Sequence, residues 1–196
     1  MDVFSRKKQL RERLLRQRRS LPEPKRRRLS AAICENLLSL SELAAAKTVL
    51  SYLPAGGEAD VGALNELLQK NGAAVAFPVC GSDGSMEAYL PEAPDAFVAG
   101  IHGIPEPDPR RARRIPPEEL DAVIAPCVAF SPDCRRLGRG RGYYDRFLPR
   151  CKNAFTAAAG YGFQKTEDLP ADEADVSLHA AADESRVYRR PENRKK

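Results

Sequence analysis

The sequence predicts an α/β protein: a single domain with an open, mainly parallel β-sheet flanked by helices on both faces. Short apolar runs rich in β-branched and aromatic residues alternate with longer amphipathic segments, which is typical of parallel strands joined by helices. Residues 121–125 (DAVIA) are almost wholly apolar, as expected of a strand buried on both faces of a sheet. Right-handed crossovers between such strands place the helices on both sides.

The first 40 residues predict two basic helices that pack on the body of a domain spanning residues 1–185. The apolar stripe of the first helix consists of Val3, Phe4, Leu10, Leu14 and Leu15, at spacings close to three and four. The segment 20–22 (SLP) ends that helix, and Pro22 opens a second one that runs to about residue 40. Its predicted inward face carries Leu29, Ala32, Ile33, Leu37 and Leu40.

Further strands are expected at residues 47–53, 73–77, 86–90, 121–125 and 154–159, and a last one at 176–181. Asp60 is predicted to cap a helix that carries Val61, Leu64, Leu67 and Leu68 and that stops at residues 71–72. Residues 91–117 are rich in proline and charge, so they are expected to be mostly loop. The basic tail 186–196 is expected to be frayed.

Charge is concentrated at the N-terminus. Residues 1–30 contain twelve Lys and Arg against three acidic residues, whereas the remaining 166 contain 20 Lys and Arg against 24 acidic residues. The sequence pI near 9.0 therefore reflects the first helices. Such a segment is compatible with a nucleic-acid arm, a solvated helix face or a wall for an anionic substrate.

Composition excludes several classes of protein. Hydrophobic residues make up 42% and charged residues 30%, no apolar run approaches a membrane span, and the start has no apolar signal-peptide core. Five cysteines without a CxxC pair, and two histidines, argue against a disulfide framework and a zinc site. We therefore expect a cytoplasmic protein with reduced thiols, in which Cys127 is a buried filler and Cys134 a surface residue.

The segment 121–148 carries the chemistry. A buried strand ends at Pro126, a polar loop follows, and Gly138-Arg-Gly-Arg-Gly142 leads into an apolar helix. Alternate glycines allow close approach of a ligand, and backbone N–H groups before a helix favour phosphate. The run is neither a Walker loop nor a dinucleotide fingerprint, and a flexible RNA-binding tract is the alternative. Asp145 is equally suited to capping the helix or to binding magnesium.

At this point the residues resemble a known family. The run RLGRGRGYYD at residues 136–145 is similar to the signature of the 5-formyltetrahydrofolate cyclo-ligase family. Companion motifs follow in the family's order: KKQLR at 7–11, SYLPAGGEAD at 51–60, FPVC at 77–80, GIPEP at 103–107 and GYGFQ at 160–164. The resemblance covers nearly the whole chain. It implies a fold like that of the sugar isomerases and CoA transferases.

The resemblance also implies a reaction, in which ATP and 5-formyltetrahydrofolate give 5,10-methenyltetrahydrofolate, ADP and phosphate with Mg²⁺ present. By this resemblance the catalytic residues are Arg136, Arg139, Arg141 and Tyr144. ATP contacts fall on Lys7, Lys8, Gln9, Leu10, Arg11, Arg136, Leu137, Gly138, Arg139, Gly140, Arg141, Gly142, Tyr143 and Tyr144. Folate contacts fall on Leu53, Glu58, Arg139, Gly140, Arg141, Gly142 and Tyr143, and metal ligands on Asp145 and Asp175.

The chain departs from the family pattern at four positions. Cys127 and Cys134 stand where glycine is usual, and Ser131 and His179 stand where aspartate is usual. These changes affect the loop conformation and the surroundings of the metal, but not residues 136–145. We expect a monomeric enzyme acting on 5-formyltetrahydrofolate, with or without a polyglutamate tail. The alternative is a basic nucleic-acid-binding module, which would carry its arginines on one open face and not around a cleft with Glu58 and Asp145.

Overall fold

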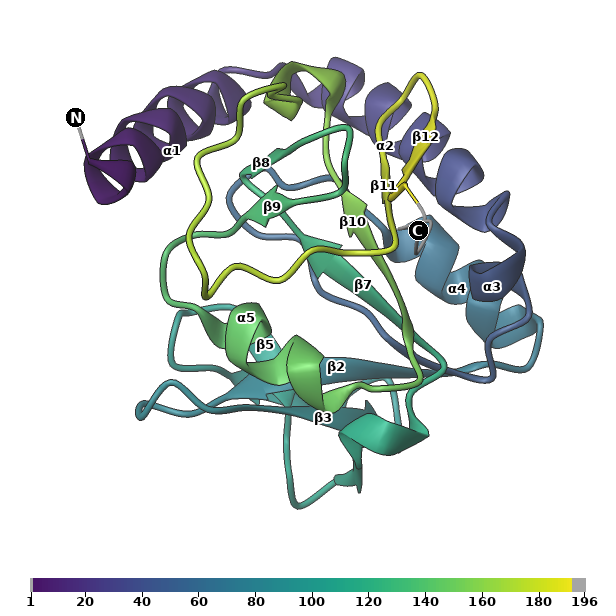
Figure 1. The fold of residues 1–196 in the computed structure, drawn as a ribbon. Coiled ribbons are helices and arrows are strands. Elements are labelled where there is room, and N and C mark those ends of the chain that lie inside the picture. Colours follow the sequence, from purple (N-terminus) through teal and green to yellow (C-terminus); the bar gives the residue numbers. More distant parts are fainter. Residues whose placement is uncertain (1, 192–196) are drawn as a thin grey trace, which may run out of the picture.

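The computed structural model describes residues 2–191, and an eight-stranded mixed sheet forms its centre (Figure 1). The strand order is β12-β11-β10-β7-β1-β2-β3-β6. The strands are β1 Thr48–Leu50, β2 Ala74–Cys80, β3 Met86–Pro91, β6 Ala112–Ile115, β7 Ala122–Pro126, β10 Phe155–Ala159, β11 Ala180–Ala182 and β12 Val187–Arg189. The central strands β11, β10, β7, β1 and β2 are parallel, and antiparallel strands flank them at both edges. The predicted α/β class with a mainly parallel sheet is confirmed.

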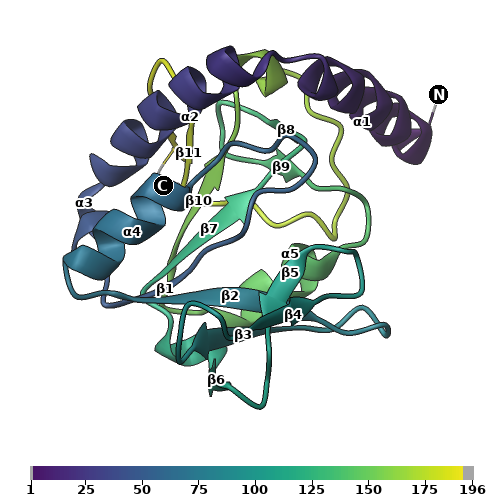
Figure 2. The same cartoon turned by 180° about the vertical axis from the view of Figure 1, so that it is seen from behind.

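Helices cover both faces of this sheet. The helices α2 (Glu23–Leu38), α3 (Ser41–Ala44) and α4 (Gly62–Lys70) lie together on one face (Figure 2), and α5 (Tyr143–Phe147) lies on the other. Successive strand residues point to opposite faces. Val49 and Ile124 accordingly join the core under α2–α4, whereas Leu50 and Val123 join the core under α5. The central strands of the sheet are therefore buried between two apolar cores.

The first helix, α1 (Val3–Arg19), packs differently from the prediction. Leu14 is buried in a small cluster with Val128, Ala129 and Leu137, which belong to the hairpin β8–β9 (Ala129–Phe130 and Arg136–Leu137) and its approach. The start of the helix extends past the body (Figure 1), so Phe4 is 74% exposed. The predicted stripe was therefore wrong for its first turn, where Val3 and Phe4 are exposed.

The stretch from 91 to 117 is more regular than expected. It contains β4 (Phe97–Ala99), β5 (Pro105–Pro107) and the edge strand β6, and a 3-10 helix follows at Pro117–Glu119. The strands β4 and β5 form a separate antiparallel pair. Most of this stretch is loop, as predicted, but the short strands within it were not foreseen, because strands of three or four residues show no clear sequence periodicity. This hairpin forms one wall of the site described below.

The C-terminal tail is also more ordered than expected. Val187–Arg189 form β12, antiparallel to β11, and Arg189 makes an ion pair of 2.6 Å with Glu42 of α3. The expectation of a frayed tail was thus wrong for β12, and residues 192–196 lie outside the described part of the chain. Within residues 2–191, no helix has both the length and the apolar character needed to cross a bilayer.

The Glu42–Arg189 pair makes a testable contribution to stability. The hydrogen bond from Arg189 lowers the pKa of Glu42 to about 2, from an ordinary value of 4.5. Because the folded state holds this proton less tightly, the stabilisation is complete above the ordinary pKa and is lost as the pH falls through the lowered one. We expect Glu42→Gln to unfold at lower urea concentration than the wild type near neutral pH. The difference should vanish in strong acid; a constant difference would contradict the pairing.

Candidate active site

A cavity of about 540 Å³ opens at the carboxyl ends of the central parallel strands. This edge is where open α/β sheets bind ligands. Its walls come from the segments that follow β1 and β7, from the hairpin β4–β5, and from the glycine loop before α5. The predicted residues that line it are Leu53, Glu58, Arg136, Gly138, Arg139, Arg141, Gly142, Tyr143, Tyr144 and Asp145.

The glycine loop owes its shape to two left-handed residues. Gly140 has φ +98° and Gly142, which precedes the first residue of α5, has φ +68°. A side chain at either position would be strained in this conformation. Arg11 of α1 braces the loop, because its Nε donates a hydrogen bond of 2.9 Å to the carbonyl of Gly138. The loop is therefore fixed by its own backbone and by the N-terminal helix.

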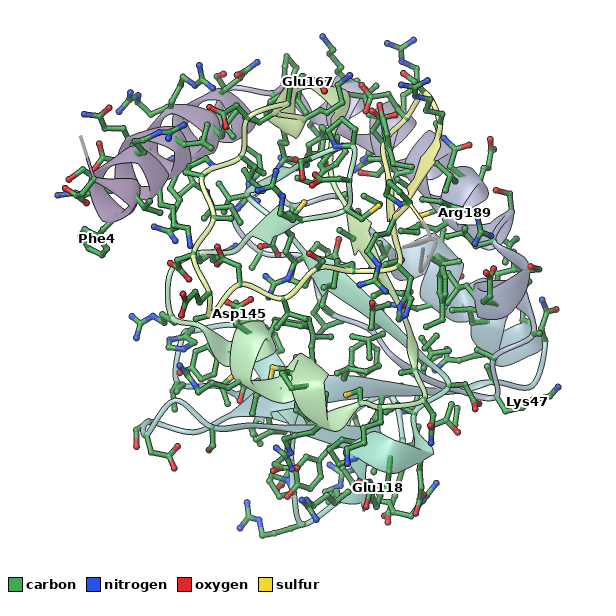
Figure 3. The ribbon with its side chains drawn as sticks, viewed as in Figure 1. Phe4, Lys47, Glu118, Asp145, Glu167 and Arg189 are labelled. Atoms are coloured by element: carbon green, nitrogen blue, oxygen red, sulfur yellow. The ribbon has the colours of Figure 1, made fainter. Side chains whose placement is uncertain are left out.

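Arg136 forms the buried centre of the site. Its side chain is 3% exposed and donates a hydrogen bond of 2.8 Å to Asp145 Oδ1, at the N-terminal end of α5 (Figure 3). The guanidinium carbon lies 5.2 Å from the ring centre of Tyr144. Among the described residues, neither Arg136 Nε nor the buried hydroxyl of Tyr144 has a hydrogen-bond partner. Because buried polar groups are normally paired, a ligand in the cavity is the natural partner for both.

Glu58 is clamped between two arginines. Arg139 Nη2 lies 2.8 Å from Glu58 Oε1, and Arg18 Nη2 lies 3.8 Å from the same oxygen. The other oxygen accepts a hydrogen bond of 3.0 Å from the backbone N–H of Ala55. Glu58 is 7% exposed, so this carboxylate is buried and compensated. Arg18, which was not among the predicted site residues, has a side chain that is 1% exposed and also donates a hydrogen bond to the carbonyl of Gly56.

The basic N-terminal motif divides into inner and outer residues. Lys7 is buried and contacts Asp172 at 2.7 Å and Asp175 at 2.5 Å. Burial alone would lower the pKa of Lys7, but the two carboxylates outweigh it and raise that pKa. Lys8 and Gln9 are exposed, whereas Leu10 and Leu137 pack in the Leu14 cluster. The predicted site residues that do not line the cavity are Lys7, Lys8, Gln9, Leu10, Arg11, Leu137, Gly140 and Asp175.

The two predicted metal ligands lie around one arginine. Burial lowers the pKa of Arg11, and the negative charges of Asp175 and Asp145 oppose that shift. Within residues 2–191, no three His, Cys, Asp or Glu side chains form a metal cluster. Mg²⁺, however, binds through one or two carboxylates together with phosphate oxygens and water. Asp145 lines the cavity, whereas Asp175 does not, and each carboxylate already has a cationic partner, Arg136 and Lys7 respectively.

The two cysteines at glycine positions are both buried. Cys127 donates its thiol to the carbonyl of Ala159, and burial raises its pKa to about 12. Cys134 is fully buried and has φ +64°, a conformation that favours glycine. The expectation of a surface Cys134 was wrong, because its thiol turns inward toward the carbonyl of Tyr188. Both thiols therefore lie in the interior of the protein, and Cys127 also lines the cavity.

One wall of the cavity was not anticipated. The β4–β5 hairpin contributes Ile101, His102 and Ile104 from its tip and Glu106 from β5. His102 Nε2 lies 3.0 Å from the hydroxyl of Tyr143, which ties the hairpin to α5. The motif GIPEP contained part of this wall, but only the resemblance singled it out, and no role was assigned to its glutamate.

The sequence is similar to that of one known protein family over most of its length. The family model described as the 5-formyltetrahydrofolate cyclo-ligase family matches residues 3–184. The chain belongs to this family. A cyclo-ligase of Mycolicibacterium smegmatis is 33% identical over 88% of this chain and 90% of its own length, and one of Escherichia coli is 31% identical over 89% and 99%.

Solved structures of the cyclo-ligase family share the fold. A 5,10-methenyltetrahydrofolate synthetase from Aquifex aeolicus is 35% identical, with a TM-score of 0.84 over 97% of this chain and 95% of that one. The enzyme from Mycoplasma pneumoniae is 27% identical, with a TM-score of 0.75 over 94% and 100%. The known activity of the family is the ATP-dependent cyclisation of 5-formyltetrahydrofolate. Family membership favours the enzyme over the nucleic-acid-binding alternative.

Proposed function

We propose that this protein converts 5-formyltetrahydrofolate and ATP into 5,10-methenyltetrahydrofolate, ADP and phosphate in the cavity at the carboxyl ends of the strands. The observation that carries the proposal is the buried, incompletely bonded guanidinium of Arg136, which faces the same cavity as Arg139, Arg141 and Glu58. Concentrated positive charge in a buried site stabilises a transferring phosphoryl group. Glu58 and Leu53 supply the folate side of that cavity.

The reaction needs two bond-forming steps. The formyl oxygen attacks the γ-phosphorus of ATP, and ADP leaves with the electron pair of the broken P–O bond. N10 then attacks the formyl carbon, loses its proton, and expels phosphate with the original formyl oxygen. Arg136, Arg139 and Arg141 hold the phosphoryl oxygens, and the glycine amides of residues 138–142 position the rest of the nucleotide. Lys7 and Arg11 of α1 support this end of the site from outside the cavity lining, Arg11 through Gly138 and Lys7 through Asp172 and Asp175.

The tyrosines and carboxylates complete the proposed site. Tyr143 and Tyr144 offer aromatic surfaces to the flat rings of the ligands, and the unpaired hydroxyl of Tyr144 is a donor for a reacting oxygen. Asp145 and Asp175 would hold Mg²⁺, which neutralises charge on the phosphate oxygens when bound. Asp145 would keep Arg136 in place through their 2.8 Å hydrogen bond.

We further propose a monomer that acts in the cytoplasm and accepts reduced folates with or without a polyglutamate tail. All five cysteines are free, which is typical of a reducing compartment. No nucleic-acid partner is proposed, because Arg136, Arg139 and Arg141 line a cavity together with Glu58 and Asp145 and do not form an open face.

The direct test of the proposed function is turnover with both substrates. Purified protein should produce the near-ultraviolet absorbance of 5,10-methenyltetrahydrofolate only when 5-formyltetrahydrofolate, ATP and magnesium are all present. ADP should form in equal amount. Release of ADP without the methenyl product, or no reaction at all, would contradict the proposal.

Replacing Asp145 with asparagine tests the proposed magnesium site. If the carboxylate holds the metal, turnover should fall about a hundredfold, and added magnesium should restore part of it by mass action. If Asp145 only supports the start of α5, asparagine serves equally well and little changes. Asp95→Asn, which alters an exposed ion pair to Arg111, is the matched control. Superimposable magnesium titrations of wild type and Asp145→Asn would exclude the metal role.

A further inference from the structure

Glu106 is a second buried carboxylate in the cavity. It lies on β5, is 7% exposed and lines the same cavity as Glu58. Unlike Glu58, it makes no ion pair with a lysine, arginine or histidine within residues 2–191. A buried charge without a partner is costly unless hydrogen bonds compensate it. The phosphoryl transfer proposed above gives Glu106 no role, so its burial must have another reason.

The surroundings hold the Glu106 side chain in a fixed place. Its Oε2 accepts a hydrogen bond of 3.2 Å from the backbone N–H of Cys80, at the end of β2. A Cβ atom on Gly100 would lie 2.4 Å from the Glu106 carboxyl carbon, so the glycine leaves the space that this side chain fills. Burial, and then the charge of Glu106, raise the pKa of the Cys80 thiol to about 12. The carboxylate is thus preorganised but only partly satisfied.

The walls beside Glu106 are apolar. Phe77, Met86, Ile101 and Ile104 line the cavity together with it, and Ile101 is 52% exposed in this structure. A flat heterocycle with an apolar body and a hydrogen-bond donor edge would satisfy both the walls and the carboxylate. A carboxylate is matched best by two parallel N–H donors, as in its bidentate pairing with a guanidinium.

We propose that Glu106 is a further specificity-determining residue that accepts the paired N3–H and 2-amino donors of the pterin ring of 5-formyltetrahydrofolate. This inference rests on the proposed function for the identity of the substrate. Under this proposal, the two buried glutamates Glu58 and Glu106 have different roles. Glu58 is already compensated by Arg139 and Arg18, whereas Glu106 obtains its charge-compensating donors from the ligand. Hairpin β4–β5 thereby becomes the part of the fold that recognises the pterin.

The test is equilibrium binding of 5-formyltetrahydrofolate by calorimetry to wild type and Glu106→Gln. Glutamine keeps the shape and an acceptor for the Cys80 N–H, but it presents a donor where the pterin also donates. We expect folate binding to weaken about 10- to 100-fold, while ATP binding and Tm remain close to those of the wild type. Glu92→Gln, an exposed residue just beyond β3, is the matched control.

The complementary test removes the hydrogen-bond donor from the ligand. It uses an analogue of 5-formyltetrahydrofolate that carries a methyl group in place of the 2-amino group. Wild type should lose affinity for this analogue, and Glu106→Gln should lose little more, because the two changes delete one interaction. An equal loss in both proteins, or full folate affinity of Glu106→Gln, would overturn the inference. Wild type that binds the folate but forms no methenyl product would instead contradict the proposed function, and the binding comparison would still decide the role of Glu106.

Discussion

Arg136→Ala is expected to reduce kcat/KM for ATP by about 100- to 1000-fold, the largest loss of any single substitution at this site. The change removes a buried guanidinium aimed at the transferring phosphoryl group, where one charged donor contributes several kcal/mol, on the order of 3, to transition-state stability. It also leaves Asp145 without its 2.8 Å hydrogen bond and Tyr144 without the cation over its ring. Steady-state kinetics with both substrates varied would measure the loss.

Two further variants separate charge from structure at this position. Arg136→Lys keeps the positive charge, but an ammonium group cannot donate hydrogen bonds in one plane to both Asp145 and a phosphate. This variant should therefore recover only part of the activity. Arg113→Ala removes an exposed arginine on β6 and is the control. If Arg136→Ala retained more than about a tenth of wild-type activity with an unchanged fold, the phosphoryl-binding role would be wrong.

Arg139→Ala and Arg141→Ala should separate the folate side of the site from the nucleotide side. Arg141 is exposed at the cavity, so its removal should lower turnover and raise the KM for ATP, together about a hundredfold in kcat/KM. Arg139 also clamps Glu58 at 2.8 Å and reaches the carbonyl of Ala55. Its removal should therefore raise the KM for 5-formyltetrahydrofolate as well, because Glu58 is left with the more distant Arg18.

The informative measurement is the KM for 5-formyltetrahydrofolate of each variant, compared with that of the wild type. A rise in the folate KM for Arg139→Ala but not for Arg141→Ala would support the division. Equal folate KM values in both variants would contradict a functional link between Arg139 and Glu58. Gel filtration and thermal unfolding of both proteins would show that the loop 138–142 still folds.

The fold was largely predictable because its core strands have a strong local signal. The run 121–125 is apolar at nearly every position, and Ala122 to Ala125 are buried on both faces of β7. The hairpin β4–β5 gave no such signal, since its strands are three residues long and Pro105 and Pro107 lie in one of them. Its strands pair with each other and dock beside β2 through tertiary contacts, which no local pattern encodes.

The part of the site that lies in the glycine-rich motif was predictable from the sequence. The ion pairs between residues far apart in the sequence were not. The pairing of Glu58 with Arg18 joins residues 40 positions apart through the packing of α1, which depends on tertiary contacts. A signal for Arg18 was nonetheless present: Lys7, Arg11, Leu14 and Arg18 lie at intervals of four, three and four, on one face of α1. The predicted stripe contained apolar residues alone, so of the three basic residues on this face only Lys7 and Arg11 were singled out, through the family resemblance.

The fate of the formyl oxygen tests the account most directly. A reaction with ATP and 5-formyltetrahydrofolate labelled with ¹⁸O in the formyl group should be run to completion, and the released phosphate analysed by mass spectrometry. If the cavity transfers the γ-phosphoryl group to the formyl oxygen, each phosphate carries one labelled oxygen for every methenyl product formed. Unlabelled phosphate would show that ATP is hydrolysed apart from the folate, and the proposed chemistry of Arg136 and its neighbours would be wrong.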